Sequence, residues 1–149
     1  MRVAFRRHNE KGRLACSWDA VRGARIRVPG TYMAAGADVP HDLLQYVAEA
    51  ATGYRHGFWG LVADGATFKS TGRKRTRPGR ALIAAHRDDL QRAEALPERH
   101  RTAWKAGERT PVTTAIETAF HQWRALDAGE VLVFEWPSPE GIVHRTTPG

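Results

Sequence analysis

The first part of the chain contains three short runs in which apolar and polar residues alternate. They cover residues 2–7, 13–18 and 24–28, and such alternation is typical of β-strands with one buried face. The polar faces collect five arginines: Arg2, Arg6, Arg13, Arg25 and Arg27. If the strands are antiparallel neighbours, these arginines lie on one side of one sheet, because side chains at i and i+2 share a face. The pattern therefore predicts a basic platform.

Apolar residues at helical spacing follow. Residues 39–52 are predicted to form a helix, with Pro40 in its first turn and Gly53 as its stop. A short helical or turn segment is expected at 54–63, and helices at 79–95 and 97–106. The clearest helix runs over 110–126, because Thr110 is a good N-cap and Pro111 suits the first helical position.

The chain ends in two further predicted strands, at residues 130–136 and 141–146. The segment 137–140 between them contains two prolines, which favour a turn and hence a hairpin. Strands, then helices, then a hairpin indicate an α+β fold rather than alternating β and α units. We expect an antiparallel sheet of about five strands covered by helices, in one domain spanning residues 1–149, a length that suits a single core.

The formal net charge of +7 is unevenly distributed. Residues 1–30 hold eight Lys or Arg against two acids, and residues 69–80 hold six against none. The segment 69–80 also contains Gly72, Pro78 and Gly79, so it is predicted to be a mobile basic loop. Its candidate anion-binding residues are Arg73, Lys74, Arg75, Arg77 and Arg80. A local excess of positive charge favours an anionic partner, although a solvated basic surface would have the same composition.

Several classes of protein lose support. Cys16 is the only cysteine, which excludes an internal disulfide and a zinc site of several cysteines. The seven histidines form no metalloprotease or deaminase motif, and there is no nucleophile elbow, phosphate-binding loop or dinucleotide fingerprint. The sequence thus predicts neither a cofactor nor a metal. No uncharged apolar run is long enough to span a bilayer, and we expect a cytoplasmic protein.

The predicted helix at 39–52 carries the candidate catalytic residues His41, Asp42 and Glu49. An imidazole and carboxylates on one face could bind a metal or exchange a proton. His41 and Glu49 are two helical turns apart, however, about 12 Å, which is too far for both to hold one ion easily. The alternative is a polar face in solvent, with Asp42 at the positive end of the helix dipole.

Two adjacent aromatic residues, Phe58 and Trp59, lie between Gly57 and Gly60. They are candidates for lining a ligand site, because glycine allows close approach of a backbone to an aromatic plane. The alternative is an aromatic plug that closes the core after a turn.

This part of the chain resembles a pattern found in small uncharacterised bacterial proteins. The resemblance rests on His41-Asp42-Leu43, Tyr46, Glu49, Gly53, Gly57-Phe58-Trp59-Gly60, Ala63, Gly65, Ala66 and Phe68. That family carries no assigned activity. Its members often have histidine where this chain has Gln45, so the resemblance implies a shared site or shared packing, with a metal role less supported here.

Three functional hypotheses follow from these patterns. The first is a module that binds an anionic partner, nucleic acid or a phosphate-bearing ligand, through the arginine-bearing sheet face and the basic loop. The second is a small-molecule or metal-dependent enzyme that uses His41, Asp42 and Glu49 beside Phe58 and Trp59. The third is a protein-interaction module that binds an acidic protein, which the sequence does not separate from the first.

Overall fold

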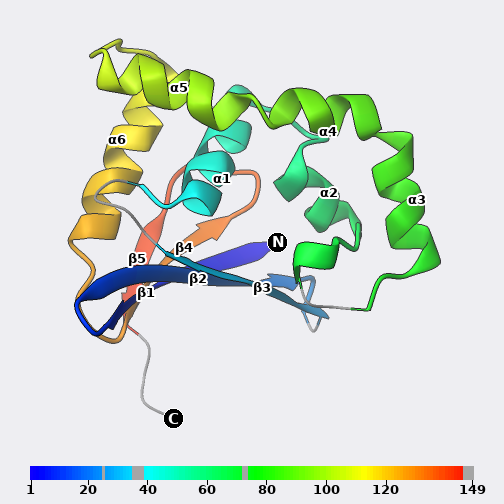
Figure 1. Ribbon diagram of the computed structural model, residues 1–149, viewed down its shortest axis with the longest axis horizontal. Helices are drawn as coiled ribbons and strands as arrows, with labels where there is room; N and C mark the ends of the chain where they lie inside the picture. Colours follow the sequence, from blue (N-terminus) through cyan, green and yellow to red (C-terminus); the bar gives the residue numbers. More distant parts are fainter. Residues whose placement is uncertain (25, 35–38, 72–73, 146–149) are drawn as a thin grey trace.

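A five-stranded antiparallel sheet forms the base of the molecule, with strand order β3-β2-β1-β4-β5 (Figure 1). The strands are β1 (Arg2–Glu10), β2 (Arg13–Arg22), β3 (Ile26–Ala34), β4 (Glu130–Glu135) and β5 (Ile142–Arg145). This computed structural model describes residues 1–24, 26–34, 39–71 and 74–145, without the side chains of residues 10, 31 and 34.

In the part of the chain that the structure describes, all helices lie on the same side of the sheet (Figure 1). They are α1 (His41–Thr52), α2 (Phe58–Asp64), the 3₁₀ helix η1 (Lys69–Thr71), α3 (Arg77–Ala85), α4 (Arg87–Ala93), α5 (Leu96–Lys105) and α6 (Pro111–Arg124). The predicted α+β fold, with an antiparallel sheet covered by helices, is confirmed. None of the described helices is long and apolar enough to cross a membrane.

The two-residue turn after β1 fixes the register of the N-terminal hairpin. Lys11 and Gly12 have φ values of 52° and 78°, as a type I′ turn requires at both central positions. The hairpin then pairs Phe5 with Trp18 and Arg6 with Ser17. Apolar side chains of both strands therefore share the face below the helices.

The helix ends differ from the prediction in the basic segment. The expected loop over 69–80 is wrong at both ends, because residues 69–71 form η1 and Arg77–Arg80 begin α3. Thr76 caps α3 by accepting a hydrogen bond from the Gly79 amide at 3.0 Å. Threonine is a typical N-cap residue, but the prediction of a loop relied on the charge of the segment instead. The expected helix over 79–95 is interrupted at His86, which separates α3 from α4.

The core lies between the sheet and helices α1, α2 and α6. Phe5, Tyr46, Trp59 and Phe134 meet there, with ring centroids 4.6–6.1 Å apart in mostly edge-to-face arrangements. Helix α6 begins as predicted, since Thr110 and Thr113 form a reciprocal capping box. The covered face of the sheet is thus tightly packed against the helices.

Candidate functional site

The uncovered face of the sheet brings together side chains from all five strands. Phe5 and Trp18 are buried beneath the helices, so their alternating neighbours point to the opposite side. This open face carries Arg2, Ala4, Arg6 and His8 from β1, Arg13, Ser17, Asp19 and Val21 from β2, Arg27 and Tyr32 from β3, Val131, Val133 and Glu135 from β4, and Ile142 and His144 from β5. The predicted basic platform is therefore geometrically possible in this fold.

A shallow cavity of about 630 Å³ extends along the middle of the open face. Its walls are Arg2, Ala4, Arg6, Asp19, Val21, Val131, Val133, His144 and Arg145. A second cavity of about 330 Å³ shares Arg2, Val133 and His144 with it, so the two are adjacent. The result is a broad concave surface with an apolar floor, whose walls carry Arg2, Arg6 and Arg145 together with the acidic residues Asp19, Glu135 and Glu140.

Some polar side chains of the open face form ion pairs or hydrogen bonds within the protein, and others do not. Arg27 lies 3.6 Å from Asp19 in an exposed ion pair, and His8 is hydrogen-bonded to Ser17 at 2.7 Å. Arg2 and Arg6 form no ion pair with any described acidic side chain. These two arginines are thus available to an anionic ligand at the cavity wall.

An aromatic group lies at the β3 edge of the same face. Tyr32 is 53% exposed, and its ring centroid is 5.2 Å from that of His8. A half-exposed aromatic ring beside cationic side chains can stack on a planar ligand. Sequence reasoning missed Tyr32, because the predicted third strand ended at residue 28 and the observed β3 continues to Ala34.

The other predicted anion-binding residues divide into two groups. Arg75 and Arg80 line a groove of about 240 Å³ together with Lys69 and Arg87, and this basic groove contains no acidic side chain in its wall. The neighbouring η1 packs against β3, so the groove borders the sheet at its β3 edge (Figure 1). Lys74 and Arg77 are exposed outside the groove wall, while Arg25 and Arg73 lie outside the described residues.

Arg7, the remaining cation of β1 near this region, has a structural role. It lies on the covered face, where its guanidinium donates to the carbonyl oxygens of Arg124 and Leu126 at 2.9 and 3.4 Å. These carbonyls belong to the last residue of α6 and to the segment just after it, where helical partners are lacking. Arg7 therefore caps α6 and is separated from the open face by the sheet.

Glu49 is fully buried and acts as a cap for α2. Its Oε1 accepts the Trp59 amide at 3.0 Å, and its Oε2 accepts the Phe58 amide at 3.1 Å and the Gln45 side chain at 3.0 Å. A Cβ on Gly57 would lie 2.5 Å from the Glu49 carboxyl, so glycine is needed there. These contacts explain the spacing of Glu49 and the Gly57–Gly60 motif as packing.

The environment of Glu49 also changes its acidity. Burial raises its pKa from 4.5 to about 7, although the hydrogen bonds from Gln45 and the α2 amides act in the opposite direction. Sequence spacing placed Glu49 on a face with His41, but Glu49 is buried and His41 is exposed. The structure therefore does not bring the predicted catalytic trio into one site.

His41 and Asp42 form a pair of their own at the start of α1. Asp42 accepts the Trp18 indole N–H through Oδ2 at 2.8 Å, and its Oδ1 lies 3.3 Å from Nδ1 of His41. The hydrogen bond to Asp42 raises the pKa of His41. The nearby Cys16 is an inert thiol, because burial raises its pKa to about 12. The pair could exchange a proton, but neither residue lines the cavities on the open face, the groove of Arg75 and Arg80, or the cavity between α5 and α6.

The predicted ligand-lining aromatics belong to the core. Trp59 is completely buried, with its ring centroid 4.5 Å from that of Trp18. Phe58 is half-buried and packs against Trp18 and Phe68. Both side chains therefore pack in or against the core in this structure and do not line a ligand site.

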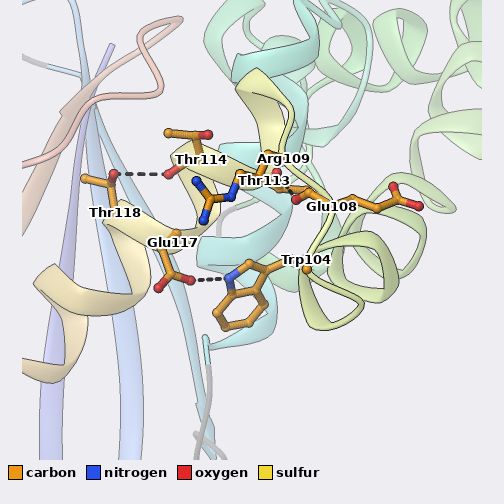
Figure 2. A pocket seen from close by; sticks show the side chains of 8 residues that line it. Trp104, Glu108, Arg109, Thr113, Thr114, Glu117 and Thr118 are labelled. Atoms are coloured by element: carbon orange, nitrogen blue, oxygen red, sulfur yellow. Dashed lines mark hydrogen bonds between the residues drawn. The ribbon is translucent and has the colours of Figure 1, made fainter.

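A further cavity of about 390 Å³ lies between the end of α5 and α6 (Figure 2). Several of its polar groups are already engaged: Glu117 accepts the Trp104 indole N–H and lies 2.8 Å from His121, which is outside the cavity wall. These hydrogen bonds lower the pKa of Glu117. Thr113, in the same wall, is engaged in the capping box of α6. The cavity thus offers a ligand few groups that are not already used internally.

One cluster was missed because its members are distant in sequence. His56, His86 and Asp89 have ligand atoms within 4.8 Å of one another. Only the pair His86 and Asp89 is close along the chain, and a three-residue spacing is a weak signal without the fold.

Searches against protein-family models, curated proteins and solved structures gave no match to this chain. The functional conclusion therefore rests on the geometry described above.

Proposed function

We propose that the protein binds single-stranded nucleic acid on the open face of its sheet. The observation that carries this proposal is the concave surface of about 630 Å³ in which Arg2 and Arg6 meet an apolar floor. Arginines at the wall can contact phosphates, and the floor can accept the faces of bases. Neither the positive charge nor the cavity alone would support nucleic-acid binding, but both occur at the same place on this face.

The shape of the surface favours a single strand over a duplex. Proteins that read the major groove insert a helix or a two-stranded ribbon. Here the cationic groups lie on a wide sheet whose five strands extend about 19 Å across, at about 4.8 Å between neighbours. Sheets of this kind bind unpaired bases by stacking them on aromatic side chains, a role that Tyr32 can fill at the β3 edge.

The basic groove supplies a second group of phosphate contacts. Lys69, Arg75, Arg80 and Arg87 surround it, and η1 brings it beside β3. A strand that crosses the open face towards β3 would continue towards this groove. We therefore expect the two basic regions to bind successive parts of one polynucleotide.

Fluorescence anisotropy with a labelled single-stranded oligonucleotide tests the proposal at several salt concentrations. For single strands log K falls with log salt by about 0.7 per phosphate contact, so R2Q/R6Q should reduce the slope by about 1.4. The matched control is R99Q/R109Q, which removes two exposed arginines from the helical side. Loss of Tyr32 stacking in Y32A should weaken binding about fivefold or more.

Two results would reject the proposal. One is the absence of binding at low salt; the other is equal weakening by R2Q/R6Q and by the control R99Q/R109Q. In the second case the attraction would depend on net charge alone, and the open face would be no more than a solvated surface. Binding of an acidic protein, with no binding of the oligonucleotide, would favour the interaction-module hypothesis.

A further inference from the structure

We infer that His56, His86 and Asp89 form a binding site for a divalent transition-metal ion, specifically Zn²⁺. The site is independent of the proposed nucleic-acid interface. His56 precedes α2, His86 lies between α3 and α4, and Asp89 is in the first turn of α4. The fold brings these separate segments together, and each contributes one ligand atom.

The distances between the ligand atoms are close to those that zinc requires. Asp89 Oδ2 lies 3.6 Å from Nδ1 of His56 and 3.9 Å from Nδ1 of His86. With Zn–N and Zn–O bonds of about 2.0–2.2 Å, the ligand atoms of a tetrahedral site are about 3.3–3.6 Å apart. Both distances from Asp89 are thus within a few tenths of an ångström of the zinc geometry, and all three ligand atoms lie within 4.8 Å of one another.

The side chains around Asp89 orient its carboxylate towards the two histidines. Arg92 donates to Oδ1 at 2.7 Å, which leaves Oδ2 directed at the two histidines. Tyr54 also donates to the Asp89 carbonyl oxygen at 2.8 Å and fixes this turn of α4. Such outer contacts orient metal ligands in known sites.

Metal binding would change the arrangement of the two histidine rings. They are stacked, with centroids 3.9 Å apart and an interplanar angle of 16°. An ion binds in the plane of an imidazole, so an ion shared by parallel rings requires one ring to rotate. Both histidines are partly exposed and can rotate, and His56 lies outside any helix. We therefore expect zinc to open the stack.

The ligand set selects the class of metal. Two imidazole nitrogens and one carboxylate oxygen suit zinc and related transition metals, whereas Mg²⁺ and Ca²⁺ prefer oxygen ligands. Three protein ligands leave a coordination position for water, as in sites that are open to substrate.

Isothermal titration with ZnCl₂, on the full chain without a histidine tag, tests the inference. We expect one Zn²⁺ per chain, and H86Q or D89N should weaken binding at least about tenfold, as loss of even an outer-shell partner can do. The control H121Q removes an exposed histidine paired with Glu117 and should change affinity less than about twofold. Unchanged binding in H86Q, or loss of binding in H121Q, would overturn the inference.

A second measurement uses the unmodified chain and so does not depend on the folding of variants. Diethyl pyrocarbonate modifies accessible histidines, and mass spectrometry locates the modified residues. Zn²⁺ should protect His56 and His86 at least severalfold, while the exposed His41 and His121 keep their reactivity. Equal modification of His56 and His86 with and without Zn²⁺ would show that no ion binds between them.

Discussion

Replacement of Glu49 by glutamine tests the buried carboxyl that caps α2. Glu49 Oε2 accepts both the Phe58 amide and the Gln45 side chain, while Oε1 accepts the Trp59 amide. A protonated acid can keep these contacts, because its O–H group still accepts from Phe58 while it donates to a flipped Gln45 amide. In E49Q the new NH₂ group, at the position of Oε2, can no longer accept the Phe58 amide.

The destabilisation expected for E49Q at low pH follows from the loss of the acceptor for the Phe58 amide. A buried donor without a partner costs about 1–3 kcal/mol. At pH 5 Glu49 is largely protonated, since burial raises its pKa to about 7. We therefore expect E49Q to lower the free energy of unfolding by about 1–3 kcal/mol at that pH.

The effect should become smaller as the pH rises. A carboxyl whose pKa is higher in the folded state than in the unfolded state stabilises the fold at low pH, and this stability is lost as the pH rises through the folded pKa. One pKa unit corresponds to about 1.4 kcal/mol, so a change from 4.5 to about 7 amounts to about 3 kcal/mol. The wild type should lose this amount between pH 4.5 and 8, whereas E49Q has no such group to ionise.

Urea unfolding of both proteins at pH 5, 6, 7 and 8 measures the difference directly. Histidines that titrate in the same range are common to both proteins, so their contributions cancel in the comparison. The control E94Q changes an exposed glutamate and should show no pH-dependent difference. A destabilisation by E49Q that stays constant or grows with pH would refute the reasoning, because it would mean that Glu49 is ionised throughout.

Two further predictions concern the same helices. G57A should lower the free energy of unfolding by about 1–3 kcal/mol in urea, because its Cβ would lie 2.5 Å from the Glu49 carboxyl; in an E49A background this loss should shrink, and an unchanged loss would contradict the assigned contact. D42N should lower the pKa of His41, as followed by NMR titration, because it removes the carboxylate that raises it. Since a raised histidine pKa stabilises the fold at low pH, D42N should also destabilise more at pH 5.5 than at pH 8, and the reverse order would be inconsistent with the pair.

The sequence predicted the sheet well because alternation reports directly on which face is buried. Phe5 and Trp18 share the covered face, and the prediction put Arg6 and Arg27 on the other, as found. Strand ends were less predictable: β3 continues beyond Pro29 and Gly30, residues that usually end a strand. Tyr32, the aromatic group of the proposed interface, was lost from the prediction for that reason.

The candidate sites were harder to predict because they depend on contacts between distant segments. Helical spacing alone placed His41 and Glu49 on one face, but the packing of α2 against α1 buries Glu49 and leaves His41 in solvent. The same packing positions His56 beside α4, where it meets His86 and Asp89. The glycine–aromatic motif at residues 57–60 thus acts indirectly: by docking α2 onto a buried carboxyl, it fixes the chain immediately after the proposed metal ligand His56. A substitution that weakens this contact between α2 and Glu49, such as G57A, should therefore reduce zinc affinity although it changes none of the three ligands.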